Sequence, residues 1–148
     1  NLRALISQES SNCTNLVGPV TSQGRAYGCG QITLPLARQL DPSLRELSDA
    51  QVAQRLQTDN AYNLSLSARN YSQLLTRYNG NTDLALAAYN GGPGANQAST
   101  NCPTQRRWEC VWDTSGCYGT GVNTCTPNTG YAETRNYVSN IRRVGSQL

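Results

Sequence analysis

Near its start the sequence reads Leu2-Arg3-Ala4-Leu5-Ile6-Ser7-Gln8-Glu9-Ser10-Ser11. Leu2, Leu5 and Ile6 recur at helical spacing, which predicts a short helix with one buried apolar stripe. Glu9 follows Ile6 by three residues, so this helix carries a carboxylate toward its apolar neighbours near its own C-terminal end. The helix dipole disfavours an anion at that end and burial raises the pKa of a carboxyl group, so both effects favour the protonated acid. A protonated carboxyl at the edge of an apolar pocket is what a general acid needs. The stretch by itself fits a solvated glutamate at a frayed helix end as well, so both interpretations of Glu9 stay open until the rest of the chain is considered.

Length and composition favour one globular domain with a polar but weakly charged surface. The chain has 148 residues, of which 37% are apolar and only 14% charged, and a chain of this length buries roughly 70% of its unfolded surface. Such a surface suits an exported protein that handles a polar, uncharged ligand such as a glycan.

The charge pattern does not favour nucleic acid as a partner. The net charge is +3, and all twelve basic residues are arginines, scattered apart from Arg106-Arg107 and Arg142-Arg143. A nucleic-acid-binding protein should show a basic stripe with interleaved aromatic residues, which this sequence lacks. A weak attraction to an anionic polymer such as a cell wall remains open.

The cysteines predict disulfides in an oxidising compartment rather than a metal site. Histidine is absent and no pair of cysteines has the Cys-x-x-Cys spacing of zinc sites, so we expect no metal. Proximity in sequence favours pairing of Cys13 with Cys29, which leaves the last four to pair among themselves, although other connectivities are possible. The set is Cys13, Cys29, Cys102, Cys110, Cys117 and Cys125.

Several classes of function are disfavoured. The absence of histidine rules out Ser-His-Asp and Cys-His catalysis, and no Gly-rich phosphate loop follows a predicted strand. We therefore expect no cofactor, and carboxylates and tyrosines remain as catalytic candidates. No stretch is apolar enough to span a membrane and no signal peptide is present, so we expect a mature form or an excised domain.

Most of the remaining chain is predicted to be helical. The loop after Glu9 is too rich in glycine and proline for a helix up to about Gly30. Ser48-Asp49-Ala50-Gln51 is a capping box, Thr82 is expected to cap a central apolar helix, and Gly91-Gly92-Pro93-Gly94 should end that helix. Strand signals are sparse, which predicts a mainly α fold in one domain over residues 1–148. The predicted helices cover about 33–40, 48–56, 59–78, 82–89 and 131–144.

Residues 95–129 show no periodicity and are predicted to be a disulfide-stapled insertion, because loops this long tend to be functional or disordered. The insertion contains Trp108 and Trp112, with Glu109 and Asp113 beside them. Two alternatives stay open here. The insertion forms a wall of a cleft, where tryptophans stack on sugars, or it is a surface staple with the tryptophans packed beneath it.

Four blocks in order carry a resemblance to a known family. They are Glu9-Ser10, Gly28-Cys29-Gly30-Gln31-Ile32, Ala88-Tyr89-Asn90-Gly91-Gly92-Pro93-Gly94 and Tyr131-Ala132-Glu133-Thr134-Arg135-Asn136-Tyr137-Val138. This series resembles the soluble lytic transglycosylase family, which has a goose-type-lysozyme-like fold. The helix with Asn63, Ala68 and Tyr71 is also similar to the family's. Two departures stand out. The family usually reads Gly-Leu-Met-Gln in the second block, and the loop after Glu9 is longer than usual and carries Cys13.

The resemblance implies an activity on peptidoglycan glycan strands, at the bond between N-acetylmuramic acid and N-acetylglucosamine. It implies that Glu9 acts first as acid and then as base, while the sugar's own C6 hydroxyl closes a 1,6-anhydro ring. The substrate-binding residues implied are Ser22, Gln31, Tyr89, Asn90, Tyr131 and Glu133.

Four of these binding residues also have a structural alternative. Gln31 could cap the next helix, Tyr89 could be packing support, and Asn90 could satisfy the backbone of the Gly-Pro-Gly turn. Glu133 near a helix start is favoured by the dipole whatever its function.

Two other functions are weighed against the transglycosylase. A goose-type-lysozyme-like muramidase would hydrolyse the same bond and need a second carboxylate, with Glu109 or Asp113 as candidates. An inactive wall-binding component of a secretion or phage-tail machine would have lost the reaction. In each case we expect an extracytoplasmic location, whether periplasmic, secreted or virion-associated. A larger secretion, conjugation or phage-tail assembly is a candidate partner, and the isolated domain is expected to be a monomer.

Overall fold

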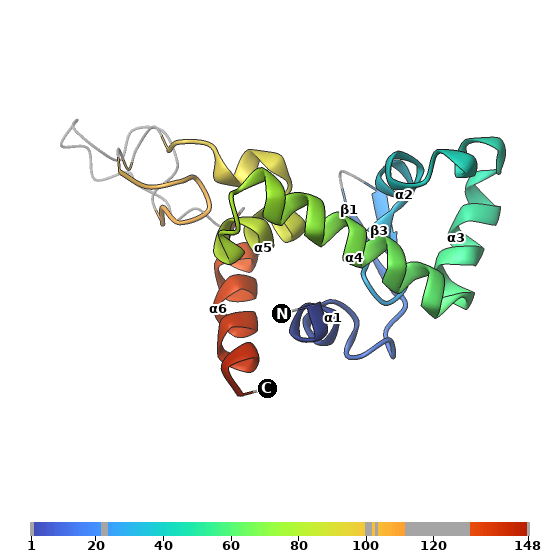
Figure 1. Cartoon of the computed structure of the whole chain (residues 1–148), viewed down its shortest axis with the longest axis horizontal. Coiled ribbons are helices and arrows are strands. Elements are labelled where there is room, and N and C mark those ends of the chain that lie inside the picture. The colour runs from blue at the N-terminus through green and yellow to red at the C-terminus, as the bar shows by residue number, and fades with distance from the viewer. Residues whose placement is uncertain (1, 22–23, 100–101, 103, 112–130, 148) are drawn as a thin grey trace. The chain divides into compact units, whose positions relative to one another are not determined.

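The computed structural model describes residues 2–21, 24–99, 102, 104–111 and 131–147. The chain divides into two compact units, residues 1–73 with 147–148 (unit 1) and residues 74–146 (unit 2), and each unit is described by itself. Figure 1 shows that most of the elements are helices, which confirms the predicted mainly α class. A single domain over residues 1–148 stays a prediction.

Unit 1 combines helices with a small antiparallel sheet that the sequence reading missed. The sheet has the strand order β1-β2-β3, with a bulge in β1 between Val17 and Val20. Its strands are short and contain Gly18, Pro19 and Gly24, so no alternating pattern marks them. The elements are α1 (Leu2–Ser10), β1 (Val17–Thr21), β2 (Gly24–Tyr27), β3 (Ile32–Thr33), α2 (Leu34–Leu40), the 3₁₀ helix η1 (Pro42–Glu46), α3 (Asp49–Thr58) and α4 (Asn60–Arg77), which continues into unit 2.

Apolar side chains from the sheet and the helices after it form the core of unit 1. Helices α2 and α3 contact each other and the strands. Burying one large aliphatic side chain contributes roughly 1.5–3 kcal/mol, so this cluster holds the sheet against the helices. Its fully buried members are Ile32, Ala37, Leu44, Val52 and Leu56, with Leu40 and Leu66 at their edge.

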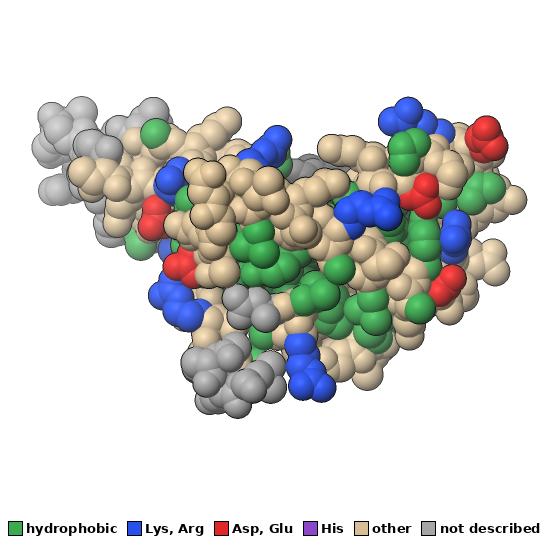
Figure 2. Space-filling view, in the orientation of Figure 1, with side chains coloured by type: hydrophobic (Ala, Val, Ile, Leu, Met, Phe, Trp, Pro, Cys, Tyr) green, Lys and Arg blue, Asp and Glu red, His purple; other side chains and the backbone are tan. Residues whose placement is uncertain are grey.

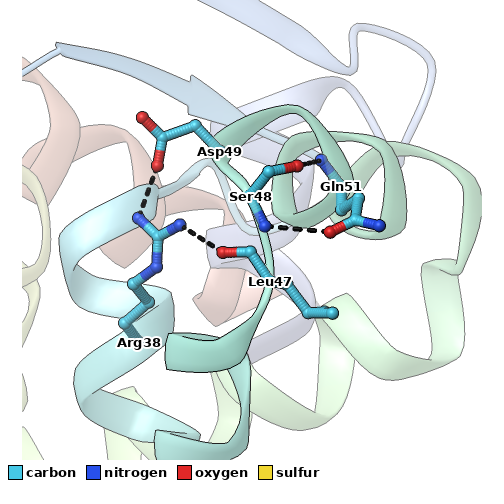
Figure 3. Close-up of polar contacts among 5 residues, drawn as sticks. All are labelled: Arg38, Leu47, Ser48, Asp49 and Gln51. Atoms are coloured by element: carbon cyan, nitrogen blue, oxygen red, sulfur yellow. Dashed lines mark hydrogen bonds and ion pairs between the residues drawn. The ribbon is translucent and has the colours of Figure 1, made fainter.

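Local sequence signals predicted the helix starts correctly, with one exception. The Ser48 Oγ accepts from the Gln51 N–H at 3.2 Å and the Gln51 Oε1 accepts from the Ser48 N–H at 2.9 Å, which confirms the capping box (Figure 3). The predicted cap at Thr82 is wrong. Asn81 caps that helix one residue earlier, because its side-chain oxygen accepts from the Leu84 N–H at 3.2 Å.

Helix α4 buries polar as well as apolar side chains. Leu64 and Ala68 are only half-buried, whereas the buried residues are Asn63, Leu66, Ser67, Asn70 and Tyr71. The polar residues lie inward because Asn63 makes hydrogen bonds there that water would otherwise have to provide. Sequence periodicity counts apolar residues and does not detect such a face.

Unit 2 is built around α5 (Thr82–Gly91), which is followed by the 3₁₀ helix η2 (Pro93–Asn96) and by α6 (Ala132–Gln147). Four successive residues of α5, 85–88, are buried, as its apolar sequence predicts. Gly92, with φ at +79°, ends the helix in a conformation that favours glycine. In α6 the apolar residues Tyr137, Val138 and Ile141 are buried.

In the described part of the chain, no helix has both the length and the apolar character needed to cross a membrane. On the face drawn in Figure 2, arginine side chains are scattered among acidic and neutral ones and do not gather into one basic stripe.

Candidate active site

Glu9 lies half-buried in the last turn of α1, one residue before the helix ends. The next residue, Ser10, is only 1% exposed, and its Oγ lies 2.7 Å from the Cys29 carbonyl oxygen and 3.2 Å from that of Ile6. A hydroxyl has one proton to donate, and the shorter contact is the one to Cys29. This bond joins the Glu9 end of α1 to the turn Gly28–Gln31, which we call the glycine turn.

The chain leaves α1 through a left-handed segment that a disulfide fixes. Ser11, Asn12 and Cys13 have φ values of +51°, +58° and +67°, and each such non-glycine residue costs roughly 1–2 kcal/mol. The Ser10 Oγ accepts from the Cys13 N–H at 2.9 Å, and the Ser10 carbonyl accepts from the next two N–H groups, each at 2.9 Å. Cys13 is bonded to Cys29, which confirms the predicted pairing and ties the long loop to the glycine turn.

The glycine turn is also held from the side of α4. Asn63 is fully buried, and its Oδ1 accepts from the Gly30 N–H at 2.8 Å while its Nδ2 donates to the Tyr27 and Leu56 carbonyls at 3.0 and 3.1 Å. Gly28 has φ at +80°, and a Cβ there would lie 2.0 Å from the Asn63 Nδ2. The close approach of α4 therefore requires glycine at this position.

Gln31 closes the glycine turn with its own side chain. It has φ at +51°, and its Nε2 donates to the Gly28 carbonyl at 3.0 Å and to the Asn15 carbonyl at 3.5 Å. The alternative in which Gln31 caps the next helix is wrong, because the N-cap of α2 is Thr33 and no side chain caps it. Ser22 lies outside the described residues.

In unit 2 a hydrogen bond between side chains joins the third and fourth sequence blocks. The Thr134 Oγ1 donates to the Asn90 Oδ1 at 2.9 Å, and Thr134 is 2% exposed. Asn90 and its neighbour Tyr89 are half-buried at the end of α5. Asn90 thus holds the start of α6, which differs from the alternative in which its side chain bonds the backbone of the turn. Glu133 is exposed in the first turn of α6, where the helix dipole favours a carboxylate.

Tyr131 lies over the residues that follow α5. Its hydroxyl oxygen would be 3.6 Å from a Cβ built on Gly94, and the Arg107 guanidinium lies 5.5 Å from its ring centre. Both contacts leave the ring half-buried.

The beginning of the insertion packs inward, and Trp108 is part of that packing. Trp108 is 8% exposed and its Nε1 donates to the Asn96 Oδ1 at 3.0 Å, while Arg135 Nη1 donates to the Trp108 carbonyl at 3.1 Å. For this tryptophan the structure therefore favours the staple over a sugar-stacking wall. A disulfide joins Cys102 to Cys110. The remaining residues of interest in the insertion, Trp112, Asp113, Cys117 and Cys125, lie outside the described part of the chain.

Comparison with protein families finds one match. The model of the family described as Transglycosylase SLT domain matches residues 1–109. The chain belongs to this family. Comparison with curated proteins and with solved structures returned no match. The match includes the first three sequence blocks and ends before the fourth, which begins at Tyr131. At the level of the family, the function is that of a peptidoglycan lytic transglycosylase.

Each unit of this SLT domain brings together part of the predicted site. Unit 1 joins the Glu9 end of α1 to the turn that holds Gln31, and unit 2 joins the Tyr89-Asn90 pair to the start of α6. Sequence reasoning did not assign roles to Ser10 and Thr134, although both lie inside the blocks that carry the resemblance. Among the described residues, no group of histidine, cysteine and carboxylate side chains could hold a metal ion.

Proposed function

We propose that this SLT domain is an enzyme that cleaves the β-1,4 bond between N-acetylmuramic acid and N-acetylglucosamine in peptidoglycan, with formation of a 1,6-anhydro ring on the muramic acid. The observation that supports this most is the bond between Ser10 and the Cys29 carbonyl at 2.7 Å. It links the Glu-Ser block to the glycine turn, so the one carboxylate of the first block is held on a fixed element.

Glu9 is proposed to act twice. The protonated carboxyl donates its proton to the glycosidic oxygen as the bond from the muramic acid C1 to that oxygen breaks. The substrate's N-acetyl group covers the cationic centre. The C6 hydroxyl oxygen then bonds to C1, and the Glu9 carboxylate takes the hydroxyl proton, which restores the acid. No water is consumed, and an intramolecular nucleophile has the advantage of proximity.

The placement of the other carboxylates supports a mechanism with a single acid. The remaining acidic residues of unit 1 within its described part lie between positions 41 and 59, on η1, α3 and their caps. Three of them make structural contacts, since Asp41 binds Ser43, Asp49 binds Arg38, and Asp59 caps α4. Ordinary hydrolases place a second carboxylate beside the first to position water or attack the sugar.

Glu109, a candidate for that second carboxylate, also has a local role. Its Oε1 accepts from the Arg106 N–H at 3.0 Å, which closes a turn in the insertion. This use of the side chain supports the transglycosylase over the muramidase. The two disulfides and the wall substrate support an extracytoplasmic location.

Purified peptidoglycan and the Glu9→Gln variant test the proposal. We expect the wild-type chain to release fragments that end in 1,6-anhydro-muramic acid, measured by mass spectrometry. Loss of the acid and base should slow the release by about 10²–10⁴-fold, while the unfolding temperature and sedimentation with the wall stay unchanged. Glu46→Gln, an exposed carboxylate on η1, is the matched control and should lyse the wall at the wild-type rate.

Three results would contradict the proposal in different ways. Fragments with reducing ends would identify the muramidase. Binding of the wild-type chain to the wall without any release would identify the wall-binding component. Wild-type lysis by Glu9→Gln would show that another residue carries the proton.

A further inference from the structure

A concave site in unit 1 is lined by residues of β2, α2 and the start of α3, and none of the residues assigned to the proposed reaction is among them. Its volume is about 280 Å³. It adjoins the glycine turn, because Tyr27 lines the cavity and directly precedes Gly28 in the chain. The Tyr27 carbonyl accepts a hydrogen bond from Asn63, which also holds the turn. The residues that line it include Arg25, Tyr27, Leu34, Pro35, Arg38 and Asp49.

One of its two arginines is already fixed by the fold. Arg38 Nη1 lies 2.7 Å from the Asp49 Oδ1, and Arg38 Nη2 donates to the Leu47 carbonyl at 3.1 Å (Figure 3). These contacts use two of the five N–H groups of the guanidinium. The bonds orient Arg38 against the start of α3 and neutralise its charge with Asp49.

The other arginine has no acidic partner among the residues that the structure describes. Arg25 is exposed on β2 and lies opposite Val20 in the sheet register. It shares a face of the strand with Tyr27, since alternate residues of a strand point to the same side. Two arginines and one aspartate leave the cavity with one net positive charge.

The walls between these charges suit a small anionic group on an apolar stem. Tyr27 and Leu34 are half-buried, and Pro35 lies in the first turn of α2. A guanidinium binds a carboxylate through two parallel N–H bonds, and partial burial strengthens such a pair.

We propose that this cavity binds a carboxylate of peptidoglycan, with Arg25 as its ion-pairing partner. The inference rests on the proposed function, because the wall is what would bring such carboxylates to a cavity next to the glycine turn. Two sources exist in the wall. One is the stem peptide, whose residues carry free carboxyl groups, and the other is the lactyl group of a muramic acid that has lost its stem.

Binding measurements on the full chain test the inference without any cleavage. A synthetic stem peptide with free carboxylates should bind to the wild-type chain by calorimetry and shift the backbone NMR signals of Gly24, Arg25 and Tyr27. The same peptide with every carboxyl group amidated should not bind. Arg25→Gln should weaken binding about tenfold. Arg45→Gln, which removes an exposed arginine on η1, should bind as the wild type does.

A second arm separates the two sources. Stem-free glycan, prepared with an amidase, should shift the same NMR signals only if the lactyl carboxylate is the ligand. Failure of both ligands to bind overturns the inference, as does equal binding of the amidated peptide or equal affinities for Arg25→Gln and Arg45→Gln. Fragments without anhydro ends would contradict the proposed function alone, because these titrations do not depend on the reaction.

Discussion

The glycine turn of unit 1 and the Asn90–Thr134 junction of unit 2 are both built from the sequence blocks that carry the resemblance, but the contacts that hold them differ in kind. The glycine turn has anchors on two helices, through Ser10 and Asn63, and a disulfide to Cys13. The contacts of the junction are noncovalent and include the side-chain hydrogen bond from Thr134 to Asn90, at 2.9 Å. The carboxylate proposed to carry the reaction therefore lies beside a turn that has a covalent anchor, as a preorganised site requires.

The two regions also differ in which of their motif residues are available to bind a substrate. At the glycine turn, the side-chain amides of Gln31 and of Asn63 on α4 donate hydrogen bonds to backbone carbonyls. In unit 2 Glu133 is exposed and Tyr131 is half-buried. A motif residue is thus not always a ligand. The substitutions below test how strongly the contacts of each region stabilise the fold.

The largest effect is expected from Gly28→Ala. A Cβ there would lie 2.0 Å from the Asn63 Nδ2 and 2.2 Å from the Leu56 carbonyl oxygen, so either α4 or the turn must move. We expect a loss of at least about 4 kcal/mol in the free energy of unfolding, measured by urea denaturation. Gly80→Ala is the matched control. Gly80 has φ at +81° with no atom within 4 Å of its Cβ position, so only the backbone penalty of roughly 1 kcal/mol applies. Equal losses would show that crowding does not define the turn.

The second test removes one disulfide from each unit. The Cys13–Cys29 bond spans 16 residues and the Cys102–Cys110 bond spans 8. Closing these loops contributes about 3 and about 2.5 kcal/mol, so stability falls by similar amounts in the two double-alanine variants. Wall lysis should separate them. It should fall about tenfold only in Cys13→Ala/Cys29→Ala, because that bond fixes the segment between Glu9 and the glycine turn. Equal lysis by both variants would contradict a positioning role for the first disulfide.

Sequence reasoning succeeded where the signal is local. The capping box at Ser48 and the helix stop at Gly92 were predicted because each depends on a few neighbouring residues. It failed where the signal is carried by tertiary contacts. The sheet was missed because its strands pair Gly- and Pro-containing segments, and Asn63 occupies the inward face of α4 for hydrogen bonds that no periodicity records. Within the candidate site, the order of blocks predicts Glu9 and Gln31 as site residues, which stays a prediction, but it did not indicate that Gln31 would bond back to the turn.

The third test breaks the junction in unit 2. Thr134→Val keeps the shape of the side chain but removes the donor to the Asn90 Oδ1, so the free energy of unfolding should fall by about 1 kcal/mol. Thr134→Ser keeps the hydroxyl and should retain the bond. We expect little change at Glu9, and therefore a wild-type product pattern with a lower unfolding temperature for the valine variant alone. A loss as large as that of Gly28→Ala would show that the junction is as constrained as the glycine turn.

The smallest effect concerns a bond that responds to pH, unlike the uncharged anchors of the glycine turn. Tyr62 donates its hydroxyl proton to Asp41. Burial and this bond to the carboxylate raise the pKa of Tyr62 from 10.0 to about 12. A pKa raised by folding contributes stability that is present below pH 10 and lost as the pH rises toward 12. The Ser43 hydroxyl, and then Tyr62, lower the pKa of Asp41, so its contribution is present at neutral pH and lost in acid.

Two variants assign the two ends of this pH profile. Tyr62→Phe should remove the part of the decline between pH 10 and 12 that Tyr62 causes, at a loss of about 0.5 kcal/mol at neutral pH, because the pair is largely solvated. Ser43→Ala should weaken the acid side and leave the alkaline side intact. Urea titrations at each pH measure both. If the stability of Tyr62→Phe declines in alkali as that of the wild type does, then the pH-sensitive contact is not the Tyr62–Asp41 pair.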